Sequence, residues 1–375
     1  MRLAALHSIV LPLVLLYAPG SIAQTAPSGE AQSARYVIAD QDASGPGGSD
    51  MAALLVLLQS PKVNLLGITV VSGDSWRDVE VAHTLRLLEL MGRTDVKVYP
   101  GAAFPLVRTQ EWTNLASQLF GKVTYMGAWN ARVKQRWDEV PDLQEGNPTT
   151  KAADEDAAHF MIRMVHQHPH QVTIYGAGPL TNIALAIRLD PHFAELAQEL
   201  VIMGGSINPH TQAAEWINAP RHEFNFWFDP EAASITLTAR WPKITVTTID
   251  ASIQTSLTEV LSALASSKSN AAQYLIRYAR HNNSAAYAWD ELAAATWLDP
   301  AITKQAREVY MDVNLSHGPN YGDVLTFSDN GKPNLALQKV YAQTDVDAAL
   351  LSRDLVALFG AATPHAKDPA PLPEK

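Results

Sequence analysis

Apolar runs and amphipathic stretches alternate along most of this chain. The apolar runs are short and rich in β-branched residues, as strands are, and the run at 63–71 is apolar at most positions, which is typical of a strand buried on both faces. Helical patterns separate them. This order predicts one α/β domain in which helices flank a mostly parallel central sheet. The predicted strands are 36–38, 63–71, 96–99, 172–175, 199–203 and 244–249, and the first predicted helices are 51–58, 77–91 and 155–168.

Two regions depart from this rhythm. Residues 104–150 carry several Trp and Tyr residues without clear periodicity, which predicts a functional loop or lid. Aromatic residues that only pin a loop to the surface are the alternative. The C-terminal part is mainly helical with edge or antiparallel strands, predicted as helices at 256–264, 271–281, 292–297 and 346–359 and strands at 308–314, 324–327 and 335–342.

The N-terminus has the pattern of a secretory signal over residues 1–23. Arg2 supplies a positive start, Ile9–Tyr17 an apolar core too short to span a bilayer, and Ser21-Ile22-Ala23 a cleavage site. A buried or membrane-anchoring helix is the alternative. We therefore predict a periplasmic or secreted protein without a stable membrane anchor, with a disordered segment at 24–34, the domain at 35–360 and a disordered, solvated tail at 361–375.

The composition of the chain limits the kinds of molecule that it can bind. The chain has 375 residues and a net charge of −10, and it lacks the clustered Lys and Arg that neutralise phosphates, which argues against nucleic acid. It has no Cys, so a disulfide framework is excluded. The sequence does not define the oligomeric state, and a homo-oligomer stays open.

The stretch from Val37 to Asp50 carries the most chemistry. It reads as strand, Gly-rich loop and helix start, and it predicts that Asp40, Asp42 and Asp50 converge at the carboxyl end of a strand, where open α/β sheets bind ligands. Such oxygens suit a hard cation such as Ca²⁺. Turn chemistry with a helix N-cap at Ser49 or Asp50 is the alternative. A phosphate loop is disfavoured, because no Gly-Lys-Ser/Thr ending follows.

Several separated motifs together resemble the inosine-uridine preferring nucleoside hydrolases. That family has a strand followed by Asp-x-Asp-Pro-Gly-x-Asp-Asp, and this chain is similar, with a loop longer by three residues. The resemblance covers about residues 36–298, and its other motifs are Leu66-Gly67-Ile68-Thr69, Gly178-Pro179-Leu180-Thr181-Asn182, Met203-Gly204-Gly205, Glu223-Phe224-Asn225, Asp229-Pro230-Glu231 and Asp290 with Leu292-Ala293.

The resemblance implies a bound Ca²⁺ and hydrolysis of the N-glycosidic bond of a ribonucleoside or related riboside. By position, Asp42, Asp50 and Asp290 would be side-chain metal ligands, and Ala177 would contribute its backbone carbonyl. Asp42 would also deprotonate the attacking water. Hydrogen bonds to the sugar suit an oxocarbenium-like transition state. The positions assigned to substrate are Glu223, Asn225, Asp74, Ser49, Met203 and Trp289.

Three positions depart from the family pattern. Ser49 replaces the second loop Asp, so a strong acceptor for a ribose hydroxyl is missing; Asp74 replaces a frequent Asn; and Trp289 replaces the His that often serves as acid. Trp289 could stack on the base with Trp76, Tyr125 or Trp129, or it could pack beneath the pocket. A non-catalytic periplasmic nucleoside or sugar binder is therefore the alternative function. A structural protein leaves the clustered Asp residues unexplained.

Overall fold

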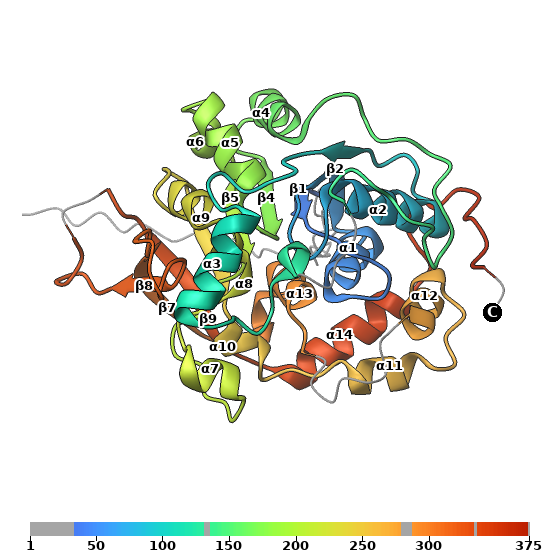
Figure 1. Ribbon diagram of the computed structural model, residues 1–375. Coiled ribbons are helices and arrows are strands. Elements are labelled where there is room, and N and C mark those ends of the chain that lie inside the picture. Colours follow the sequence, from blue (N-terminus) through green and yellow to red (C-terminus); the bar gives the residue numbers. More distant parts are fainter. Residues whose placement is uncertain (1–33, 131–135, 279–286, 334–335, 374–375) are drawn as a thin grey trace, which may run out of the picture. The chain divides into compact units, whose positions relative to one another are not determined.

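A nine-stranded sheet lies at the centre of the computed structural model, which describes residues 34–130, 136–278, 287–333 and 336–373 (Figure 1). The strand order is β3-β2-β1-β4-β5-β6-β9-β7-β8. The strands are β1 (Arg35–Gln41), β2 (Val63–Val70), β3 (Val98–Pro100), β4 (Val172–Ala177), β5 (Glu199–Met203), β6 (Ile244–Thr247), β7 (Thr303–Val313), β8 (Val324–Phe327) and β9 (Lys339–Val346).

The sheet is parallel from β3 through β9, and only β7 and β8 run antiparallel to their neighbours. The prediction of a mostly parallel sheet within one α/β domain is thus confirmed. From β1 the chain continues to β2 and β3 on one side, and β4, β5 and β6 follow on the other. The strand order therefore reverses between β1 and β4, and such a reversal opens a crevice at the carboxyl ends of the two strands.

Alternate residues of β1 face two different cores. Val37 and Ala39 pack in one apolar cluster and Ile38 in the other, because successive side chains of a strand point to opposite faces. The first core includes helices α1 (Ser49–Gln59), α2 (Arg77–Met91), α11 (Thr258–Leu264), α12 (Asn270–Tyr278), α13 (Asp290–Leu298) and α14 (Ala348–Gly360). The second includes α4 (Ala157–Gln167), α5 (Thr181–Leu189), α6 (Phe193–Leu196) and α9 (Pro230–Leu237).

Helix α1 is buried on nearly all sides, from Asp50 to Gln59. Its residues are apolar around the whole helix, which is typical of a helix enclosed by other elements. The N-cap is Gly48 and no side chain caps the helix, so the predicted cap at Ser49 or Asp50 is wrong. Both residues instead point their polar groups toward α13, as described below.

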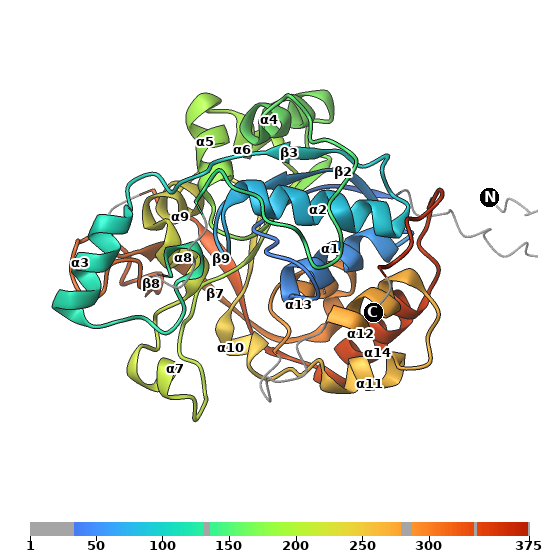
Figure 2. The ribbon, with the colours of Figure 1, turned by 45° about the vertical axis from the view of Figure 1, so that its right-hand side comes forward.

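The aromatic region at 104–150 is less irregular than the sequence indicates. It contains α3 (Gln110–Phe120), capped by the Thr109 side chain, and the short helix η1 (Gly127–Trp129). The pattern is hard to recognise because only Thr113 of α3 is buried, while Leu115, Leu119 and Phe120 are exposed. Figures 1 and 2 both place α3 beside the β7–β8 end of the sheet.

The predicted solvated tail has defined contacts in the part that the structure describes. The backbone N–H of Lys367 donates to the carbonyl of Gly92 at 2.7 Å, and that of Ala370 donates to Glu89 at 2.8 Å. Ala370 and Leu372 also pack against the first core. Through these contacts the described part of the tail packs on the domain, although its composition is polar and rich in Pro. Among the residues described, no helix has the length and apolar character needed to cross a membrane. The predicted signal at 1–23 lies outside the described residues.

Candidate active site at the carboxyl ends of β1 and β4

The site begins where the strand order reverses. Asp42 follows β1, and Ala177 is the last residue of the neighbouring strand β4, opposite Gln41 in the register. Helices α1 and α13 approach the same edge, and Figure 1 shows them side by side below β1 and β4. The structure thus brings together the strands and helices that carry the four predicted metal ligands.

Asp42 lies against two glycines that leave space for its carboxylate, and one backbone N–H binds it. A Cβ on Gly73 would lie 2.0 Å from Oδ2 of Asp42, and one on Gly178 would lie 2.7 Å from Oδ1. Only residues without a side chain allow this approach. The backbone N–H of Asp74 donates to Oδ2 at 3.0 Å. Burial and the charges of Asp74 and Asp50 raise the pKa of Asp42 well above its ordinary value.

Asp50 and Asp290 form the second half of the acidic cluster. Their carboxyl groups hydrogen-bond to each other, and Nε2 of Gln41 donates to Oδ2 of Asp290 at 2.6 Å. Tyr175 restrains the backbone at the start of α13, since its hydroxyl donates to the Asp290 carbonyl at 2.7 Å. Burial and the Asp50 charge raise the pKa of Asp290 well above its ordinary value. Sharing a proton is one way to relieve this repulsion, and binding a cation is another.

The chemistry of these residues fits a hard cation. Asp42, Asp50 and Asp290 offer carboxylate oxygens, which Ca²⁺ prefers, and their mutual repulsion favours a positive charge between them. In the part of the chain that the structure describes, however, no group of three or more His, Cys, Asp or Glu side chains already has the spacing of a metal centre.

Asp40 does not join this cluster, although the sequence predicts that it converges with Asp42 and Asp50. Its Oδ1 accepts hydrogen bonds from Thr69 at 2.6 Å and from Asn182 at 2.8 Å. The reason is strand alternation: Asp40 faces the same side as Ile38, whereas Asp42 lies beyond the end of the strand. Burial raises the pKa of Asp40 to about 7. Asp40 thus ties β1 to β2 and α5.

Three predicted substrate residues meet at the end of β5. Glu223 is the N-cap of helix α8 (Phe224–Phe228), and its carboxylate accepts from the backbone N–H groups of Gly205, Asn225 and Phe226. Nδ2 of Asn225 donates to the Met203 carbonyl at 3.2 Å. Because β5 is next to β4, this group lies one strand away from Ala177. It forms a rigid polar wall at the same edge of the sheet.

The aromatic insertion reaches the site through Tyr125. The phenol hydrogen-bonds to Asp74, and the ring meets Phe224 edge-on at 4.9 Å. Burial of the phenol and the Asp74 charge raise the pKa of Tyr125, while its ring remains partly exposed. The N–H of Ala128 also donates to the Gly73 carbonyl at 2.9 Å. These contacts agree with a segment that borders the site.

Trp289 packs against two aromatic residues that the sequence did not single out. It lies 5.8 Å from Trp216 of helix α7 (Ala214–Asn218) and 5.4 Å from Tyr287, measured between ring centroids. Trp76 and Trp129 instead contact each other in a separate cluster. Trp216 precedes Trp289 by more than seventy residues, and nothing in the sequence pattern relates the two.

Sequence reasoning also missed two buried glutamates. Glu80 accepts from the backbone N–H of Ser75 at 2.6 Å, and burial and the Asp42 charge raise its pKa well above the ordinary value. Glu291 contacts Ser49 and the Trp289 backbone. From sequence alone, a Glu in the first turn of a helix is expected to face solvent. Only the direct sequence neighbourhood of Asp290 could have drawn attention to Glu291.

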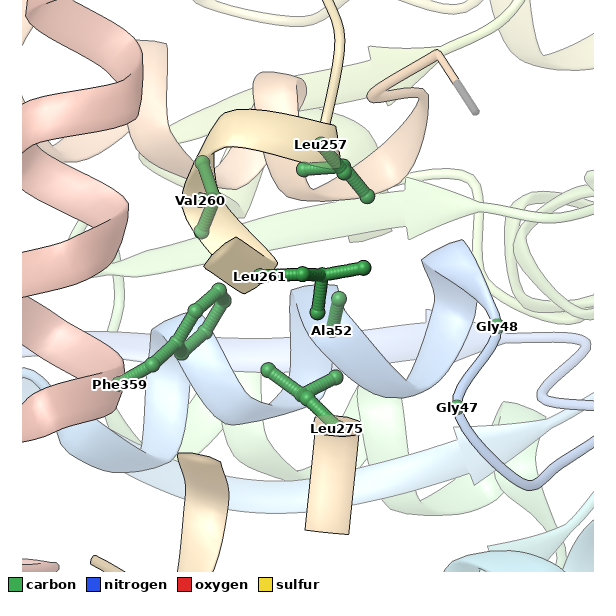
Figure 3. A pocket seen from close by; sticks show the side chains of 8 residues that line it. All are labelled: Gly47, Gly48, Ala52, Leu257, Val260, Leu261, Leu275 and Phe359. Carbon is green, nitrogen blue, oxygen red and sulfur yellow. The ribbon is translucent and has the colours of Figure 1, made fainter. Parts of the chain in front are cut away.

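An apolar cavity lies beside the acidic cluster rather than in it. Its volume is about 30 Å³, which is too small for a nucleoside. Figure 3 shows aliphatic side chains and Phe359 pointing into it, with Gly47 and Gly48 of the loop at one end. Because its lining carries no polar side chain, we assign it to packing between α1, α11, α12 and α14.

Comparison with known proteins agrees with this architecture. The family model of the inosine-uridine preferring nucleoside hydrolases matches residues 37–351. A probable uridine nucleosidase from Oryza sativa subsp. japonica is 33% identical over 61% of this chain and 64% of its own length. An uncharacterized protein of Schizosaccharomyces pombe is 28% identical over 78% of this chain and 77% of its own length. A plant nucleoside hydrolase structure superposes with a TM-score of 0.68 at 24% identity, covering 87% of this chain and 99% of that one.

The matching family model, together with the fold shared with a solved nucleoside hydrolase, defines a hydrolytic enzyme built on an α/β domain. The chain belongs to the inosine-uridine preferring nucleoside hydrolase family, a metal-dependent group, and the predicted resemblance and enzyme class are confirmed. The match to the rice relative spans 64% of that protein's length.

Proposed function

We propose that this protein hydrolyses the N-glycosidic bond of ribonucleosides to free base and ribose, with Asp42 as the base that takes a proton from water. The observation that carries the proposal is the fixed, buried Asp42 carboxylate at the point where the strand order reverses. Family membership and the similarity to a probable uridine nucleosidase of rice support a ribonucleoside as substrate.

The two oxygens of Asp42 have different surroundings. Oδ2 accepts the N–H of Asp74, and Oδ1 lies against Gly178. The proton from water would be held at Oδ1, because that oxygen is not engaged by the Asp74 backbone. Burial raises the proton affinity of the carboxylate, and a base works best when its pKa lies near the operating pH.

The sugar would lie against the group formed by Met203, Glu223 and Asn225, and Asp74 would contribute a further acceptor. Glu223 already accepts three backbone N–H groups, so its position is fixed before substrate arrives. Carboxylates held in place stabilise the positive charge that develops on the sugar in the transition state. Trp289 would lie beside the leaving base.

A calcium ion is part of the proposal. Asp42, Asp50, Asp290 and the Ala177 carbonyl would hold it, and when bound it would supply positive charge next to water and the sugar hydroxyls. Other residues position these ligands whether or not the ion is bound. Gln41 and Tyr175 hold Asp290 in place, and Gly73 and Gly178 leave room for Asp42.

Export to the periplasm or outside the cell is a further part of the proposal. It is supported by the charged start, short apolar core and cleavage pattern of residues 1–23. N-terminal sequencing of the protein recovered from a periplasmic fraction tests it, and an intact Met1 on protein confined to the cytoplasm would contradict it.

The function is tested with purified protein lacking residues 1–23 and a panel of purine and pyrimidine ribonucleosides. Release of ribose is measured as reducing sugar, and free base is measured by chromatography. We expect both products in equal amounts from at least one nucleoside. Saturable binding of a nucleoside without any release would instead support the alternative, a non-catalytic binder.

A further inference from the structure

We propose that Glu291 is a positioning residue of the site, which acts with Ser49 to set the turn that carries Trp289 and Asp290. This inference rests on the proposed function, because the two residues matter through their roles there. The Ser49–Glu291 pair joins positions 242 residues apart in the chain. It links the N-terminal turns of α1 and α13, which pack closely along their length.

The contacts around the pair form a closed set. The Ser49 hydroxyl donates to Oε2 of Glu291. The Ser49 oxygen in turn accepts the backbone N–H of Asp290 at 3.0 Å and that of Trp289 at 3.2 Å. Oε2 of Glu291 also accepts the Trp289 N–H, at 3.1 Å. The side chains of Ser49 and Glu291 therefore bind each other and together accept the backbone N–H groups of Trp289 and Asp290.

This arrangement performs the work of a helix cap. The first N–H groups of a helix have no partner within the helix, and an N-cap side chain usually accepts from them. The N-cap of α13 is Trp289, whose side chain makes no capping hydrogen bond. Ser49 accepts instead from the neighbouring helix, and Glu291 accepts the N–H of the N-cap residue itself, as a capping-box Glu does. Trp289 can thus point its ring elsewhere.

Ser49 and Glu291 also depend on each other through charge. Glu291 is completely buried, and its Oε1 has no hydrogen-bond partner among the residues that the structure describes. An Asp at position 49 would place a second carboxylate against it, and two buried carboxylates repel each other. A serine is neutral and can donate. With serine at position 49, the buried Glu291 side chain meets a hydroxyl donor instead of a second carboxylate.

The pair completes the restraints on the Asp290 turn. Gln41 fixes the Asp290 side chain and Tyr175 fixes its carbonyl, while Ser49 fixes its N–H. Without the pair the turn would keep its contacts with Gln41 and Tyr175, but the backbone N–H groups of Trp289 and Asp290 would lose their acceptors. Trp289 and Asp290 would then become less well positioned at the same time.

The experiment compares Ser49→Ala, Ser49→Asp, Glu291→Gln and the double variant Ser49→Asp/Glu291→Gln. We expect Ser49→Ala to lower kcat about tenfold with a smaller change in KM, since one net hydrogen bond and two buried acceptor contacts are lost. Ser49→Asp should be worse than Ser49→Ala. The double variant should recover to at least the level of Ser49→Ala, because a Gln amide can donate to the new carboxylate.

The matched control is Glu145→Gln, at a buried glutamate that pairs with His83 on helix α2. It should leave kcat unchanged even if the melting temperature falls. Ser49→Asp with wild-type kcat, or a double variant no better than Ser49→Asp, would overturn the proposal. If Glu145→Gln lowered kcat as much as Ser49→Ala does, the loss in Ser49→Ala would reflect general destabilisation of the fold. That result would also overturn the proposal.

Hydrogen–deuterium exchange of the peptide containing residues 287–292 separates this inference from the proposed function. Ser49→Ala should speed exchange of that peptide, and the double variant should slow it again relative to Ser49→Asp. If the wild-type protein hydrolyses no nucleoside but these exchange changes occur, the proposed function fails while the positioning role stands. Unchanged exchange in Ser49→Ala overturns the positioning role, whatever the activity.

Discussion

The backbone N–H of Asp74 donates a 3.0 Å hydrogen bond to Oδ2 of Asp42, and this bond joins the chain segments that follow β1 and β2. It links the proposed base to a residue assigned to the substrate. A side chain at position 73 would collide with the same oxygen, since its Cβ would lie 2.0 Å away, so the glycine is needed for this contact. The two segments must therefore keep their relative position for the base to keep its direction.

We expect Asp42→Asn to lower kcat at least about 100-fold while the protein stays folded. An Asn oxygen can still accept the Asp74 N–H, but it cannot take a proton from water. Rate and melting temperature are measured together. Asp78→Asn, in a partly exposed ion pair with Arg77, is the control and should keep its activity. If Asp42→Asn retained more than about a tenth of the activity, the role of base would be wrong.

We expect protein purified without added metal to contain about one tightly bound Ca²⁺ per chain. Elemental analysis measures it. Removal with a chelator should lower both activity and melting temperature, because Asp42, Asp50 and Asp290 then repel one another in a buried place. Added Ca²⁺ should restore both properties. A protein that is metal-free, stable and active would contradict the ligand assignment.

The sequence predicted the parts of the site that depend on local order. Parallel strands end at one edge of the sheet, so the motifs after β1, β4 and β5 had to meet there. The prediction for Asp40 was wrong because the motif was treated as one unit. Asp40 still belongs to the strand and follows its alternation, whereas Asp42 does not.

The pattern of apolar and polar residues could not predict contacts between segments that are distant in the sequence. Trp216 and Glu291 gave no periodic signal that relates them to Trp289 or Ser49, because helix packing decides which N-termini meet. The exposed apolar residues of α3 likewise hid its amphipathic character. Periodicity reports which face is buried, and it does not report the partner.

We expect His222 to make unfolding depend on pH. Burial, together with the nearby positive charge of Arg108, lowers the pKa of His222 to about 4, and the Asp323 carboxylate at 4.0 Å does not reverse this. Between pH 4 and about 6.5 the unfolded chain therefore binds a proton that the folded chain does not. The free energy of unfolding should rise with pH across this window, by at most about 3 kcal/mol from this group, and then level off.

Chemical denaturation at several pH values measures the His222 effect. His222→Gln should lose part of the slope between pH 4 and 6.5, while His210→Gln, at an exposed position, should keep the wild-type slope. Equal slopes in wild type and His222→Gln would show that His222 does not titrate on unfolding in this window.

The last prediction concerns the role of Trp289 in activating the leaving base. If its ring stacks on the base, Trp289→Ala loses an aromatic contact worth about 0.5–1.5 kcal/mol, which corresponds to a loss in kcat/KM of up to roughly tenfold. The loss should be large for natural nucleosides and small for a riboside whose leaving group needs no protonation. Trp289→His should not rescue fully, because an imidazole needs partners that set its pKa and tautomer.

Two comparisons decide between activation of the base and packing. Trp137→Ala, at an exposed Trp outside the group of Trp216, Tyr287 and Trp289, should leave both substrates unaffected. Equal losses on natural and activated substrates in Trp289→Ala would place Trp289 in positioning of the sugar or of Asp290, because Trp289 directly precedes that residue in the chain. No loss on either substrate would leave Trp289 as a packing partner of Trp216. Leaving-group activation would then have to come from another residue, and Tyr125, whose phenol meets Asp74, would be the next to test.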